Sequence, residues 1–208
     1  HYYNSFVRGG ANLSPEKKER LKAINSELAV LSLKFGDNQL KETNAYKLVI
    51  DNKKDLSGLP EGVVAAAADA AKEAGMEGKW VFTLHNPSIM PFLQYADNRD
   101  LREQIYKAYI NRGSNKNANN NWDNISKMVS LRAEKAHLLG FPDYASYVID
   151  NNMAKTTDNV YKLCNQIWEA ALPNAKAEAA ELQKMINREG GKFKLAPWDW
   201  RYYSEKLK

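Results

Sequence analysis

The chain has 208 residues, of which 44% are hydrophobic and 26% are charged, proportions typical of a soluble globular protein with one large or two small domains. Its 30 basic and 25 acidic residues give a net charge of +5, and the two signs are mixed along the sequence instead of forming the basic stripe that nucleic-acid binding requires. No apolar run approaches the roughly 20 residues of a transmembrane helix. The sequence therefore predicts neither a nucleic-acid partner nor a membrane span.

The first long helix is predicted from residue 15 onward. Ser14 and Pro15 supply an N-cap and a first-turn proline. Apolar residues then recur every three or four positions, which places them on one helix face. They are Leu21, Ile24, Leu28, Leu31 and Phe35. The run Gly36-Asp37-Asn38 either ends this helix or only weakens it.

Two short strands with a helix between them are predicted next. Residues 46–51 and 79–85 have the composition and alternation of strands. An alanine-rich helix occupies residues 59–75 between them. The pattern does not decide whether the strands pair in parallel or antiparallel.

From residue 86 onward the sequence is predicted to be helical. Gly140 and Pro142 should end one helix sharply, and Asp143 should cap the next one. Pro173 should kink or split the longest helix. The predicted helices cover residues 87–96, 98–112, 121–139, 143–151, 157–188 and 197–207. The predicted fold class is mainly α, a multi-helix array with a minor two-strand β element.

Few residues here have the spacing of a reactive site. Glu134 and His137 share a helix face, a spacing that ferritin-like metal sites use, but those sites need two such pairs and this chain has one. We therefore expect Glu134 to point into solvent and His137 to serve the carbonyl end of its helix. Cys164, the only cysteine, lies among apolar residues of a helix and is expected to be a buried, inert thiol.

His85 and Asn86 lie where the second predicted strand ends, beside Pro87. Residues at such ends can line a cleft, and a histidine there can titrate near neutrality, although it more often only completes a hydrogen bond. Nucleophile and phosphate-binding motifs, G-x-S-x-G, G-x-G-x-x-G and the P-loop, do not occur in the sequence. The residues by themselves indicate a helical frame without reaction chemistry.

Several stretches, in this order along the chain, are similar to the thimet oligopeptidase family of zinc metallopeptidases, and in particular to its bacterial peptidyl-dipeptidase (dipeptidyl carboxypeptidase) branch. The resemblance covers residues 10–203. It is carried most clearly by TLHNP at 83–87, LLGFPDYASY at 138–147, NMAKT at 152–156 and PWDWRYY at 197–203.

The resemblance implies a mostly helical enzyme with two lobes that flank a deep channel for short peptides. One zinc ion is held in such enzymes by the histidines of H-E-x-x-H and a downstream glutamate, and the glutamate of the motif is the general base. Peptidyl-dipeptidases remove dipeptides from the C-terminus of their substrates. H-E-x-x-H does not occur in residues 1–208, so no catalytic or metal residue is assigned. Zinc is expected in the parent enzyme and none in this chain.

The sequence starts without Met and ends in a helical pattern, and we expect it to be an inactive, non-catalytic fragment that forms part of the channel wall. Residues 1–97 would be an N-terminal helical region with the β element, and residues 98–208 would lead into the catalytic half. The expected partners are short peptides and that missing half. His85 and Asn86 are candidates for contact with substrate. An exposed aromatic patch toward the missing half should contain Trp198, Trp200, Tyr202 and Tyr203.

One alternative stays open from the sequence: a standalone helical module that binds a peptide or a partner protein. The H-E-x-x-H motif in the downstream coding sequence would separate the two interpretations. The resemblance favours the cytoplasm as the compartment, with the periplasm as the alternative.

Overall fold

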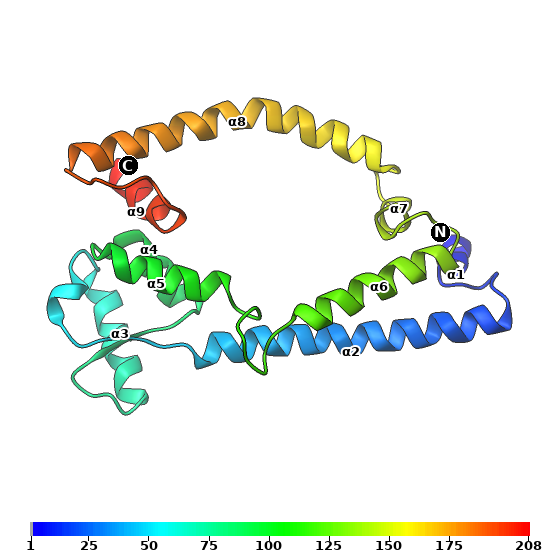
Figure 1. Ribbon diagram of the computed structural model, residues 1–208, viewed down its shortest axis with the longest axis horizontal. Coiled ribbons are helices and arrows are strands. Elements are labelled where there is room, and N and C mark those ends of the chain that lie inside the picture. The colour runs from blue at the N-terminus through cyan, green and yellow to red at the C-terminus, as the bar shows by residue number, and fades with distance from the viewer. Residues whose placement is uncertain (1) are drawn as a thin grey trace. The chain divides into compact units, whose positions relative to one another are not determined.

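The fold was obtained as a computed structural model that describes residues 2–208, so His1 lies outside the described residues. Figure 1 follows the elements along the chain. They are α1 Tyr2–Arg8, α2 Pro15–Ala45, β1 Leu48–Ile50, the 3-10 helix η1 Lys53–Leu56, α3 Glu61–Glu73, β2 Trp80–Phe82, α4 Asn86–Tyr95, α5 Arg99–Ile110, α6 Trp122–Leu138, α7 Tyr144–Ile149, α8 Thr157–Arg188 and α9 Pro197–Leu207. The predicted fold class is confirmed. Within this range, the helices are too short or too polar to cross a membrane.

The chain forms two compact units, each made of two separate stretches. Unit 1 contains the residues up to Asn38 and Lys116–Ala171, and unit 2 contains Gln39–Asn115 and Leu172–Lys208. The long helices α2 and α8 each contribute to both units. The expected division into residues 1–97 and 98–208 stays a prediction, and its boundary, residue 97, lies inside the first stretch of unit 2.

In unit 2 the two strands pair antiparallel, which the sequence had left open. Leu48 lies opposite Phe82, and Ile50 lies opposite Trp80. β2 is shorter than predicted because the backbone N–H of Thr83 donates to the Ser88 hydroxyl at 2.9 Å and not to a neighbouring strand. The strand therefore ends at the turn that begins α4.

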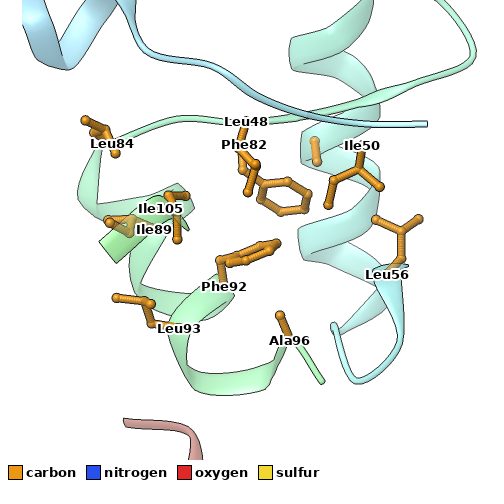
Figure 2. Packing of buried hydrophobic residues seen from close by; sticks show 11 residues of the cluster. Leu48, Ile50, Leu56, Phe82, Leu84, Ile89, Phe92, Leu93, Ala96 and Ile105 are labelled. Atoms are coloured by element: carbon orange, nitrogen blue, oxygen red, sulfur yellow. The ribbon is translucent and has the colours of Figure 1, made fainter. Parts of the chain in front are cut away.

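The core of unit 2 lies between this small sheet and helices α3, α4 and α5. Figure 2 shows the Phe82 side chain of β2 facing Phe92 of α4, and their ring centroids are 4.6 Å apart. Aromatic pairs at this spacing stabilise a core beyond their buried area. The buried cluster contains Leu48, Ile50, Leu56, Ala67, Phe82, Leu84, Ile89, Phe92, Leu93, Ala96 and Ile105.

Unit 1 is organised by the packing of α6 against the first part of α2. Ile24 and Leu31 of α2 form a buried cluster with Leu131 of α6, as the predicted face of α2 requires. At the end of this contact, the buried Asn38 amide donates to Asn121 Oδ1 at 3.0 Å. α2 continues through the Gly36-Asp37-Asn38 run, so this run does not end the helix.

α8 is also continuous, so of the two effects expected of Pro173, a kink or a split, the split does not occur. A proline inside a helix removes one backbone hydrogen bond. Alanines at positions 170, 171 and 175 surround Pro173, and alanine is the residue with the highest helix propensity. The local preference therefore favours a helix on both sides of the proline.

The sharp corner between α6 and α7 has the predicted form. Gly140 has φ +85°, and the Asp143 carboxylate accepts from the backbone N–H of Ser146 at 2.7 Å. The corner was also expected to leave Tyr144, Tyr147 and Val148 on a buried face of the next helix; Tyr144 and Tyr147 are half-buried, but Val148 is 41% exposed, so its expected burial is wrong. α7 has six residues, which is too short to bury a complete face.

We predict that Gly58→Ala destabilises unit 2. Gly58 has φ +83°, and an added Cβ would lie 2.1 Å from the Tyr95 carbonyl oxygen. The left-handed conformation costs a residue with a Cβ about 1–2 kcal/mol, and overpacking costs about 1–3 kcal/mol more. Urea denaturation followed by circular dichroism should show a loss of at least about 2 kcal/mol.

Gly62→Ala in α3 is the matched control, because an added Cβ there meets nothing within 4 Å. It should leave stability unchanged or raise it by about 0.5 kcal/mol. Equal effects of the two substitutions would show that the close approach of Gly58 to Tyr95 has no energetic importance.

Candidate functional site

His85 and Asn86 lie in unit 2 at the start of α4, and both are exposed. His85 was expected on the face of a strand, and this is wrong, because β2 ends at Phe82 and His85 occupies the N-cap position of α4. The proline at position 87 falls in the first turn of α4, where the missing N–H costs nothing. Both residues therefore stand on the turn between the sheet and α4.

Both ring nitrogens of His85 are engaged. Nδ1 lies 3.2 Å from the Thr83 hydroxyl, and Nε2 lies 3.1 Å from Asn44 Oδ1 at the end of α2. In the tautomer that suits both contacts, Nε2 donates to the Asn44 amide oxygen and Nδ1 accepts from the Thr83 hydroxyl. This arrangement fixes the ring orientation and gives His85 the role of an oriented hydrogen-bonding group.

Tyr109 and Arg112 of the α5 end region extend this polar surface. The Tyr109 hydroxyl and Asn86 Oδ1 are 3.5 Å apart, at the outer limit of a hydrogen bond. The Arg112 guanidinium lies 3.8 Å from the Tyr109 ring centroid and donates to Thr43 Oγ1 at 2.9 Å. The surface made by His85, Asn86, Tyr109 and Arg112, here called the His85 surface, offers donors, acceptors and one positive charge. It contains no nucleophile paired with a base.

The Trp-Asp-Trp-Arg-Tyr-Tyr stretch forms most of α9, and its aspartate, Asp199, is a buried ionisable group. The Asp199 carboxylate is 0% exposed. It accepts from Arg99 Nε and Nη2 at 3.0 and 2.9 Å, from Arg102 Nη2 at 3.0 Å, and from the backbone N–H of Ala196 at 3.1 Å. One carboxylate thus joins the start of α9 to two consecutive turns of α5.

Arg102 is itself 1% exposed, and its remaining donors are also used. Nη1 donates to the carbonyl oxygens of Ala96 and Asp97 at 2.7 and 3.1 Å, and Nε donates to the Trp198 carbonyl at 3.3 Å. The guanidinium carbon lies 4.0 Å from the centre of the Tyr202 ring. A buried charge is tolerated only when it is paired and hydrogen-bonded in this way.

Tyr202 connects α9 to Asp97, which lies in the turn between α4 and α5. Its hydroxyl donates to Asp97 Oδ1 at 2.7 Å, and the Ser57 hydroxyl donates to Asp97 Oδ2 at 2.6 Å. The hydrogen bond from Ser57, with a second one from Tyr202, lowers the pKa of Asp97 below its ordinary value. Burial and the hydrogen bond to Asp97 raise the pKa of the Tyr202 hydroxyl. We call this set of residues the Asp199 network; it consists of Ser57, Asp97, Arg99, Arg102, Asp199 and Tyr202.

The four aromatic residues expected to form one exposed patch are not equivalent. Tyr202 and Tyr203 are buried against Leu182 and Ile186 of α8, so their expected exposure is wrong. Tyr202 also contacts Asp97 and Arg102 on the side of α4 and α5. Trp200 is 37% exposed and lines an open groove between α9 and the loop before it.

Trp198 is half-buried and packs against α5. Its ring centroid is 6.1 Å from that of Tyr106, and the Arg99 guanidinium lies 5.4 Å from the ring. The indole N–H is buried and has no hydrogen-bond partner within residues 2–208. A contact of Trp198 or Trp200 with a catalytic half stays a prediction.

Glu134 and His137 in unit 1 serve structural contacts. The Glu134 carboxylate receives two hydrogen bonds from Arg20 of α2, both at 2.6 Å, so it does not simply point into solvent as expected. His137 Nε2 lies 2.9 Å from the Pro142 carbonyl oxygen, across the corner after α6. In the described part of the chain, His, Cys, Asp and Glu residues form no group of three that could hold a metal ion. A zinc ion therefore does not fit residues 2–208.

Sequence reasoning missed the partners of Asp199. Arg99 and Arg102 are three residues apart on α5, a spacing that brings two side chains to the same helix face. An aspartate inside an aromatic stretch, and two arginines at helical spacing elsewhere, are the signal that could have predicted a buried ion network. The distance of about 100 residues between them hid the pairing, because only the fold brings α5 and α9 together.

The chain is similar to known peptidases along nearly its whole length. The sequence pattern of peptidase family M3 matches residues 92–208. The chain is 35% identical to dipeptidyl carboxypeptidase of Escherichia coli over 206 residues, which are 99% of this chain and 30% of that protein. It is 37% identical to oligopeptidase A of Haemophilus influenzae over 207 residues, which are 98% of this chain and 30% of that protein. The chain therefore spans about 30% of the length of these relatives.

We predict that Asp199→Asn strongly destabilises unit 2, because it leaves two arginines without their buried counter-charge. Removing one partner of a buried ion pair costs roughly 3–5 kcal/mol. Chemical denaturation of the purified variant measures this loss. The control is Glu134→Gln, which removes an arginine-paired carboxylate at the surface and should cost much less, because solvent screens exposed pairs. Similar losses for both variants would contradict a special role for the Asp199 network.

We also predict that Asp97 contributes stability only while it is ionised. Its pKa is lowered in the folded chain, so the unfolded chain binds the proton more readily. The contribution is complete above the ordinary aspartate pKa of about 4 and is lost as the pH falls through the lower pKa of the folded state. The difference in free energy of unfolding between the wild type and Asp97→Asn should therefore shrink from pH 7 to pH 3. A difference that stays constant or grows toward pH 3 would disprove this role.

Proposed function

Because the chain belongs to peptidase family M3, we propose that it is part of a zinc metallopeptidase that releases C-terminal dipeptides from short peptides. The observation that carries this proposal is 35% identity to a dipeptidyl carboxypeptidase along 99% of the chain. An oligopeptidase A is similar to the same extent, so the choice of a peptidyl-dipeptidase within the family is part of the proposal. The cytoplasm is the proposed compartment, and the periplasm is the alternative.

Residues 1–208 are, in this proposal, a non-catalytic part of the enzyme. The sequence has no H-E-x-x-H motif, and residues 2–208 contain no cluster of metal-binding side chains. The zinc ion of the parent would be held by residues outside this range. It would supply an activated water and polarise the peptide carbonyl.

The His85 surface is the proposed contribution of this chain to the channel wall. An extended peptide carries a donor and an acceptor at each residue, and the Asn86 amide and the Tyr109 hydroxyl carry groups of both kinds beside the His85 ring, which Thr83 and Asn44 hold in place. Arg112 adds a positive charge that would favour a peptide carboxylate. These groups would bind and orient a substrate without taking part in bond cleavage.

The Asp199 network supports the proposal because it fixes the position of α9. It holds α9 against α5 through an ion pair between the buried Asp199 and Arg102 and a second one to the partly exposed Arg99. A helix held so firmly is a suitable connection to a catalytic half, because catalytic groups need a rigid support. Trp200, which is exposed on α9, is the proposed point of contact with that half.

We predict that purified 1–208 binds no zinc tightly and cleaves no peptide. The complete protein encoded by the gene should bind one zinc ion per chain and release dipeptides from a blocked-amine oligopeptide, and a chelator should abolish this release. Metal analysis after gel filtration and mass spectrometry of the products measure both properties.

One tightly bound zinc ion in 1–208, or chelator-sensitive cleavage by 1–208 free of contaminating peptidases, would contradict the non-catalytic role. A complete protein that binds the oligopeptide but never cleaves it would instead favour the standalone binding module.

A further inference from the structure

The first half of α8, residues 157–171 in unit 1, is an amphipathic helix. At about 100° per residue, its larger exposed apolar residues and its cysteine fall within an arc of about 160° on one side of it. They are Tyr161, Leu163, Cys164, Ile167 and Trp168, here called the apolar face of α8. The opposite side carries Asn159, Lys162, Gln166 and Glu169. Such a division is typical of a helix that buries one face against other polypeptide.

In residues 2–208 this face is exposed to solvent. Tyr161 is 66% exposed, Leu163 and Ile167 are each 59% exposed, and Trp168 is 62% exposed. Cys164, near the middle of the face, is exposed as well, so its expected burial is wrong for this chain. Contiguous exposed apolar residues of this size mark an interaction surface.

The chemistry of the helix indicates which kind of surface covers it. A helix that lies on a lipid surface has a polar side rich in Lys and Arg. Here the polar side carries the acidic residues Asp158 and Glu169 together with Lys162. An arc of about 160° is also wider than the narrow seam that one partner helix buries in a coiled coil. The face therefore suits the apolar surface of a folded body of protein more than a membrane or a single paired helix.

We propose that the apolar face of α8 is the docking surface for polypeptide of the same protein outside residues 1–208. This inference rests on the proposed function. The relatives are more than three times as long as this chain and match it along nearly its whole length, so most of such a protein is available to cover the face. The occupant presents apolar side chains and buries Trp168 and Cys164.

Cys164 offers a direct test, because it is the only cysteine among the 208 residues. The purified complete protein and purified 1–208 are each treated with N-ethylmaleimide, and the peptide that contains Cys164 is quantified by mass spectrometry over time. The rate in 1–208 should be that of an exposed thiol. The rate in the complete protein should be lower by on the order of 100-fold or more, since reaction then requires local opening, and urea should restore it.

Equal rates in the two proteins would overturn the inference. Protection that disappears when the complete protein is diluted would overturn it too, because a second copy would then be the occupant. Peptide cleavage by the complete protein is assayed on the same samples. Cleavage with an unprotected Cys164 refutes this inference alone, whereas a protected Cys164 without cleavage refutes only the proposed function.

A pair of substitutions provides an independent measurement. Trp168→Glu places a charge on the apolar face, and Gln166→Glu places the same charge on the polar side of α8. In 1–208 both should leave the melting temperature unchanged, because both positions are exposed. In the complete protein only Trp168→Glu should lower the melting temperature, by several degrees, and speed up modification of Cys164. A Trp168→Glu effect no larger than that of Gln166→Glu would overturn the inference.

Discussion

The Asp199 carboxylate is removed from water and receives hydrogen bonds from Arg99, Arg102 and its own helix start. The position of α9 depends on this interaction, because a charge buried without partners would cost several kcal/mol. Arg102 in turn binds the carbonyls of the α4–α5 turn, where Tyr202 and Ser57 hold Asp97. Asp199 and Tyr202 of the stretch at 197–203 therefore fix one arrangement of α4, α5 and α9.

The two units differ in how completely they bury their apolar side chains and pair their buried charges. Unit 2 buries an extended cluster between sheet and helices and pairs its buried charges. Unit 1 has a small buried cluster between α2 and α6, while α8 presents Tyr161, Ile167 and Trp168 to solvent. A folded protein rarely exposes so many large apolar side chains on one helix. This contrast is what membership of a longer peptidase would produce.

Sequence periodicity predicted most helices, because a three-to-four repeat of apolar residues reports one buried face. Local chemistry also predicted the corner at Gly140 and Asp143. Predictions about the burial of single residues were less successful. Cys164 was expected to be buried and is exposed, whereas Tyr203 was expected to be exposed and is buried. An amphipathic pattern reports which face needs a partner, but it does not report whether the partner lies in the same stretch of chain. The Asp199 network was missed for a related reason, since its residues are distant in sequence.

We propose that residues 1–208 support peptidase chemistry whose reacting groups lie elsewhere in the polypeptide. A crystal structure of the complete protein, with anomalous scattering recorded at the zinc edge, tests this claim most directly. We expect one zinc ion, ligated entirely by residues outside 1–208. A zinc ion ligated by any residue of this chain would contradict it.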